Sequence, residues 1–107
     1  MPLTRDYKET INKRAENDPE FAKALLNEAI TLFVNGEPDV ARLVLKDLIN
    51  STIGFESLAE KANKPNKSLQ RMLSAKGNPT MDNLTTIFKT LRQILNVKVE
   101  VNVIAES

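Results

Sequence analysis

The 107-residue chain contains neither cysteine nor histidine. Disulfides, thiol nucleophiles, histidine general bases and the usual zinc ligand sets are therefore excluded together. The sequence also lacks a paired-carboxylate motif, a glycine-rich phosphate loop and any metal-ligand spacing. We therefore expect a protein that is not an enzyme and that holds no metal and no other cofactor.

Long hydrophobic runs are missing as well. No stretch of 18 apolar residues occurs, so no membrane span is expected. The first ten residues, MPLTRDYKET, carry charges but no apolar segment, and we expect no secretory signal there. Together with the lack of cysteine, this predicts a cytoplasmic protein. The hydrophobic content of 41% is enough for one compact domain.

The charge is small in total but unevenly distributed. The net charge is +1, yet residues 61–92 hold seven Lys or Arg against a single Asp. Residues 1–60 hold eleven acidic and seven basic residues. A basic cluster of this kind favours phosphate through direct attraction and counterion release. The alternative is that these lysines only solvate a helical surface.

Apolar periodicity predicts a mainly all-α chain. We expect helices over residues 4–16, 19–34, 38–49, 55–62, 66–74 and 80–94. Asp18-Pro19-Glu20 is a helix start signal, and Asn35-Gly36 is a stop signal. Thr80 is expected to cap the last helix, and Gly77 to end the one before it. Arg42 is expected to point away from the core.

Residues 55–74, FESLAEKANKPNKSLQRMLS, have the pattern of a helix-turn-helix. An apolar stripe runs from Phe55 to Ala62 with the spacing i, i+3, i+4, i+7. The segment Asn63–Asn66 then interrupts it, because Asn tolerates left-handed backbone and Pro opens a new helix. The second helix would enter a DNA major groove, with amide and cationic side chains on its outer face.

Specific contacts are expected from the outer face of that second helix. Gln70 can bond adenine and Arg71 can bond guanine, each through two hydrogen bonds. Asn66 and Lys67 lie at the positive helix end, suited to a phosphate or an early base contact. Phosphate contacts are expected from the flanking polar residues Lys61, Lys64, Lys76 and Asn78. The alternative is an ordinary solvated helix face and polar loop.

In the segment VKVEVNV, residues 97–103, apolar residues recur at every second position instead of with helical spacing. Strict alternation predicts a strand with one buried face, and no other part of the chain has this pattern. A lone strand needs a partner for its backbone, and the same strand of a second copy would supply one. The expected dimerisation residues are Val97, Val99, Val101 and Val103. A disordered tail and a strand added to another protein's sheet are the alternatives.

The segment 53–80, IGFESLAEKANKPNKSLQRMLSAKGNPT, resembles the Xre-type, lambda-repressor-like helix-turn-helix and, more narrowly, the HigA-like antitoxins of addiction modules. The matching motifs are Leu58-Ala59-Glu60-Lys61, Ser68-Leu69, Arg71, Leu73-Ser74 and Gly77-Asn78-Pro79. Asn63 stands where the family usually has Gly, and it can adopt the same backbone. The resemblance covers residues 35–95 and adds Ser68 to the expected DNA-binding residues. It implies a dimeric repressor of its own palindromic operator and, in many members, a RelE/ParE-type toxin as partner.

The expected architecture is a single domain over residues 1–107. Residues 1–34 form an N-terminal helical extension, residues 35–95 the helix-turn-helix core, and residues 96–107 the C-terminal strand and tail. The expected function is sequence-specific transcriptional regulation by a homodimer on double-stranded DNA, as an autorepressor or as an antitoxin. The alternative is a protein-interaction module that no longer reads DNA.

Overall fold

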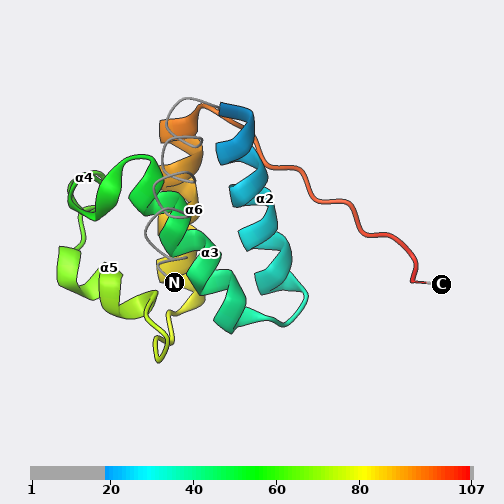
Figure 1. Ribbon diagram of the computed structural model, residues 1–107, viewed down its shortest axis with the longest axis horizontal. Helices are drawn as coiled ribbons and strands as arrows, with labels where there is room; N and C mark the ends of the chain where they lie inside the picture. Colours follow the sequence, from blue (N-terminus) through cyan, green and yellow to red (C-terminus); the bar gives the residue numbers. More distant parts are fainter. Residues whose placement is uncertain (1–18, 107) are drawn as a thin grey trace, which may run out of the picture.

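The computed structural model describes residues 19–106, and this part of the chain folds as five helices (Figure 1). They are α2 (Pro19–Val34), α3 (Pro38–Ser51), α4 (Gly54–Ala62), α5 (Asn66–Met72) and α6 (Met81–Leu95). The predicted all-α class is thus confirmed for the described residues. The helix expected over residues 4–16 lies outside them.

Helices α2 and α3 form an antiparallel hairpin, and α6 packs against α4 and α2 (Figure 1). The predicted stop at Asn35-Gly36 is confirmed, because Gly36 adopts a φ of 83° directly after α2. Pro38 is the first residue of α3, where its missing N–H costs no helical hydrogen bond. Thr80 caps α6 as expected, since its Oγ1 accepts a hydrogen bond from the Asn83 amide at 3.1 Å.

The hydrophobic core draws side chains from all five helices. Its fully buried large residues are Leu45, Leu48, Ile49, Leu58, Leu69, Leu73, Ile87 and Leu91. Each such side chain contributes about 1.5–3 kcal/mol through burial. Leu26 and Ala29 are buried too, and Phe33 meets Phe88 edge to face with ring centroids 5.8 Å apart. Residues 19–34 of the expected N-terminal extension therefore belong to the core of the domain.

The segment after α6 does not form the predicted strand in this single chain. Asn96 turns the backbone through left-handed angles, φ 55° and ψ 51°, and residues 97–106 then run extended past α2 (Figure 1). The amide of Val97 bonds Arg92 O at 3.1 Å, the last backbone hydrogen bond within residues 19–106. A strand requires a neighbouring extended chain, and the described part of the chain offers none.

Candidate nucleic-acid interface

The turn between α4 and α5 has the geometry that the sequence predicts. Asn63 adopts left-handed angles, φ 56° and ψ 47°, and its amide bonds Glu60 O at 3.3 Å. The amide of Lys64 bonds Ala59 O at 3.0 Å, which closes α4. Pro65 has extended backbone and leads directly into α5 at Asn66. Two short helices are thereby joined through a tight turn, as in a helix-turn-helix.

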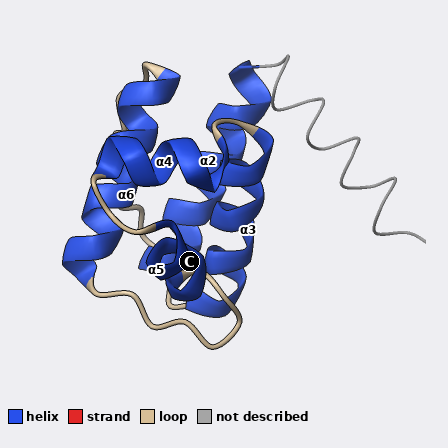
Figure 2. Cartoon of the chain, turned by 90° about the vertical axis from the view of Figure 1, so that its left-hand side faces the viewer, coloured by secondary structure: helices blue, strands red, loops and turns tan. Residues whose placement is uncertain are grey.

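Helix α5 is anchored by its apolar side and exposes its polar side. Leu69 is fully buried, and Leu73 directly after the helix is almost so. Lys67, Gln70 and Arg71 are exposed. The helix therefore holds amide and cationic groups outward on a fixed support. Figure 1 places α4 and α5 on the side of the molecule away from α2, and both face the viewer in Figure 2.

Two amide side chains on this outer face are coupled. Gln70 Nε2 donates to Asn66 Oδ1 at 2.6 Å, one helical turn apart. The bond restricts the rotamers of Gln70 before any ligand arrives. It leaves Gln70 Oε1 as an acceptor, and the second N–H of Gln70 Nε2 and the Asn66 amide nitrogen as donors. Asn66 and Ser68 are half-buried, and both belong to the first turn of α5.

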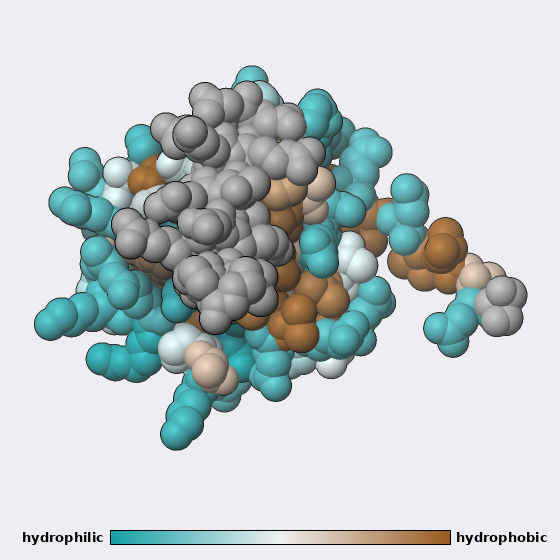
Figure 3. Space-filling view, viewed as in Figure 1, coloured by the Kyte–Doolittle hydropathy of each residue, from teal (hydrophilic) through white to brown (hydrophobic). Residues whose placement is uncertain are grey.

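The predicted phosphate-binding residues surround α5 in the chain. Lys61 lies in the last turn of α4, and Lys64 lies in the turn. Lys76 and Asn78 lie in the loop before α6. Lys61, Lys76 and Asn78 are exposed, whereas Lys64 is half-buried. Along the left-hand edge of Figure 3, where α4 and α5 lie, most of the visible side chains are hydrophilic.

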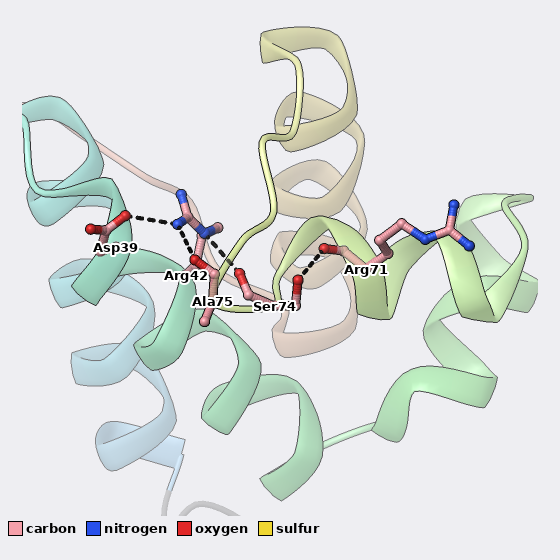
Figure 4. A network of polar contacts seen from close by, with 5 residues as sticks. All are labelled: Asp39, Arg42, Arg71, Ser74 and Ala75. Atoms are coloured by element: carbon pink, nitrogen blue, oxygen red, sulfur yellow. Dashed lines mark hydrogen bonds and ion pairs between the residues drawn. The ribbon is translucent and has the colours of Figure 1, made fainter.

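The prediction for Arg42 is wrong: its side chain is buried, not solvated. Only 7% of the residue is exposed, and its guanidinium connects α3 to the loop that follows α5. Nε donates to Ser74 O at 3.1 Å, and Nη2 donates to Ala75 O at 3.1 Å (Figure 4). Nη2 also pairs with Asp39 Oδ1 at 2.8 Å. Arg42 lies three residues before the buried Leu45, so helical spacing alone places it towards the core.

This network reaches α5 through a second bond. Ser74 Oγ donates to Arg71 O at 2.7 Å, at the end of the helix (Figure 4). The backbone that carries Arg71 is thus connected, through Ser74, to Arg42 on α3. The sequence pattern did not identify Arg42 as a residue that positions this loop, although its spacing to the buried residues of α3 was a signal.

The prediction that Gly77 ends the second helix is also wrong. Helix α5 ends at Met72, and Gly77 is not in left-handed backbone. Gly77 is needed for a different reason, because a Cβ at this position would overlap the carbonyl oxygen of Met72. The amide of Gly77 bonds Ser74 O at 2.9 Å. The loop that carries Lys76 and Asn78 therefore lies tightly against the end of α5.

Among residues 19–106, no three carboxylates come close enough together to hold a metal ion. Within the same part of the chain, no helix is both long and apolar enough to cross a membrane. Comparison with protein-family models, with curated proteins and with solved structures finds no match.

Proposed function

We propose that this protein is a sequence-specific DNA-binding transcriptional regulator that places α5 in a major groove. The observation that carries the proposal is the two-sided character of α5. Leu69 fixes the helix to the core, while Lys67, Gln70 and Arg71 are exposed on its other side. A helix of this kind, which follows α4 and a tight turn, suits insertion into a major groove about 12 Å wide.

Each polar residue has a distinct role in this proposal. Arg71 bonds O6 and N7 of a guanine, and Gln70 bonds the corresponding edge of an adenine. Asn66 orients Gln70 through the 2.6 Å bond. Lys61, Lys64, Lys67 and Lys76 neutralise phosphates, and Ser68 and Asn78 add neutral donors.

The finer proposal is a homodimeric autorepressor on a palindromic operator. Half-sites about 34–36 Å apart match two copies of α5 related by a two-fold axis. An antitoxin role follows from the resemblance to HigA-like proteins, and a RelE/ParE-type toxin would then be the second partner. If such a toxin binds α2, it contacts the outer side of the helix, because Ala22, Leu26 and Ala29 bury the other side in the core.

The test is selection from a randomised duplex library, followed by anisotropy titrations on the selected sequence. Arg71→Ala is expected to weaken that sequence by about 1–3 kcal/mol and to relax preference at one base pair. Lys76→Ala should weaken all duplexes alike and reduce the salt slope by about 1. Lys23→Ala is the matched control, because Lys23 lies on α2, away from α5 (Figure 1).

Two results would count against the proposal. One is a library that shows no enrichment with the wild-type protein. The other is equal binding by wild type and by the double variant Gln70→Ala, Arg71→Ala. Either result favours the second candidate function, a protein-interaction module whose polar α5 face has no DNA role.

A further inference from the structure

The apolar side chains of the C-terminal tail, residues 97–106, become more exposed along the chain. Val97 packs against the core, Val99 is 40% exposed, Val101 65% and Val103 95%. The same residues gave the period-two pattern in the sequence. An extended segment with an apolar row and unpaired backbone is a template for another strand.

Hollows beside the tail provide a place where a paired strand gains support. One, of about 270 Å³, lies between α2 and residues 99–102 and includes Ile30 and Val34 in its lining. A second, of about 260 Å³, lies nearer α6 and includes Leu26 and Val97. A two-stranded ribbon is marginal alone in water and becomes stable when it packs on a helix. Helix α2 is such a support.

The charges of the tail discriminate between the possible registers of a self-paired ribbon. Lys98 and Glu100 are on the same face, and Lys98 Nζ lies 3.8 Å from Glu100 Oε1 within one chain. Antiparallel pairing of two identical strands about Val99 sets Lys98 of each copy opposite Glu100 of the other. Opposite charges directly across a strand pair stabilise it, and like charges destabilise it.

Other registers lose this complementarity. A two-fold axis at Lys98 or at Glu100 would set two identical charges against each other. An axis at Val101 would set Lys98 opposite the apolar Ile104 and leave Glu100 opposite Asn102. If the axis lay between two residues, valines of one strand would lie opposite polar residues of the other, because side chains alternate between the two faces.

We propose that the tail is a homodimerisation strand that pairs antiparallel with the tail of a second copy about a two-fold axis at Val99. Val97 then faces the partner's Val101, and two Lys98–Glu100 pairs cross the interface. Residues 102–106 of each copy run back towards the base of the other tail, beside the hollow that includes Leu26 and Ile30. The inference rests on the homodimer of the proposed function and assigns its segment and register.

Charge reversal tests the register through analytical ultracentrifugation of the full chain. Lys98→Glu gives four acidic groups across the ribbon, and Glu100→Lys gives four basic ones. Each single variant is expected to raise the dimer dissociation constant by about tenfold or more. The double variant Lys98→Glu, Glu100→Lys restores both cross-strand pairs and should dimerise like the wild type. An equimolar mixture of the two single variants should form heterodimers, because each supplies the charges that the other lacks.

Several results would overturn the proposal: a monomeric wild type, single variants that dimerise as tightly as the wild type, or a mixture that stays monomeric. Circular dichroism provides the folding control, since residues 98 and 100 are exposed and outside the helices. Fluorescence anisotropy titrations with a duplex that carries a single half-site distinguish failure of the tail-pairing proposal from failure of the proposed function. A monomeric protein that still binds a half-site refutes only the tail pairing. A dimer that binds no DNA refutes only the DNA reading.

Discussion

The guanidinium of Arg42 and the carbonyl oxygen of Ser74 are joined by a hydrogen bond of 3.1 Å between residues 32 positions apart. The same carbonyl accepts the amide of Gly77 at 2.9 Å. Ser74 O therefore receives one donor from α3 and one from its own loop, which uses both lone pairs. This carbonyl holds the end of α5 against the body of the domain.

Removing the guanidinium should loosen this connection. Arg42→Ala leaves Ala75 O without its donor and Asp39 without its cation, and we expect a loss of about 1–3 kcal/mol in the free energy of unfolding. Urea denaturation measures the loss. Asp39→Asn is the control, because its carboxylate is 88% exposed and the ion pair there contributes less than about 1 kcal/mol. Equal losses for both variants would contradict the assignment of Arg42 to the loop.

Gly77 should not tolerate a methyl group. Gly77→Ala places a Cβ on the carbonyl oxygen of Met72, so the loop or the end of α5 has to move. We expect a loss of about 1–3 kcal/mol, measured by thermal unfolding, together with weaker DNA binding. At Gly36 a Cβ meets no atom within 4 Å, although φ is 83°. Gly36→Asn should therefore cost less than Gly77→Ala, because the only penalty is left-handed backbone, which Asn tolerates. A harmless Gly77→Ala would mean that the loop lies further from Met72.

The left-handed backbone at Asn63 predicts an order of stability among variants. Asn63→Ala should lower the free energy of unfolding by about 1 kcal/mol, because Ala disfavours positive φ. Asn63→Gly should be equal to the wild type or slightly more stable. Urea titrations of the three proteins give the order directly. An Ala variant as stable as the Gly variant would show that the turn adopts a different backbone in solution.

Asn66 should influence base preference without contacting a base. Asn66→Ala removes the acceptor of the 2.6 Å bond from Gln70, so Gln70 samples more rotamers. We expect lower selectivity for adenine at the Gln70 position, measured by competition between duplexes that differ at that base pair. Gln70→Ala should abolish the same selectivity, and Asn66→Asp, which keeps an acceptor, should retain most of it. Unchanged selectivity in Asn66→Ala would exclude the orienting role.

The residues that act through local backbone rules were predictable from the sequence. Gly36, Asn63 and Thr80 end or cap helices as expected, because each has an intrinsic preference for the backbone or bond required there. The outer face of α5 followed from apolar spacing. These features depend on neighbours a few residues away.

The features that escaped prediction depend on contacts distant in sequence. Arg42 was expected to point away from the core, yet hydrogen bonds to carbonyls 32 and 33 residues away make its burial favourable. Gly77 was assigned a capping role, whereas the packing of its loop on Met72 is what excludes a side chain. The strand expected over residues 97–103 is not formed, because the described part of the chain offers no extended neighbour to pair with it.

The left-handed backbone of Asn96 would set the orientation of the two subunits in the proposed dimer, in which the C-terminal tails are paired. It is the joint between the rigid α6 and the extended tail, so its two dihedral angles set the direction in which each body leaves the shared ribbon. In such a dimer, the distance between the two copies of α5 would depend on the backbone angles of Asn96. The preferred number of base pairs between half-sites would depend on the same angles. In the proposed dimer, a substitution at Asn96 would then change the preferred operator spacing without any change to α5.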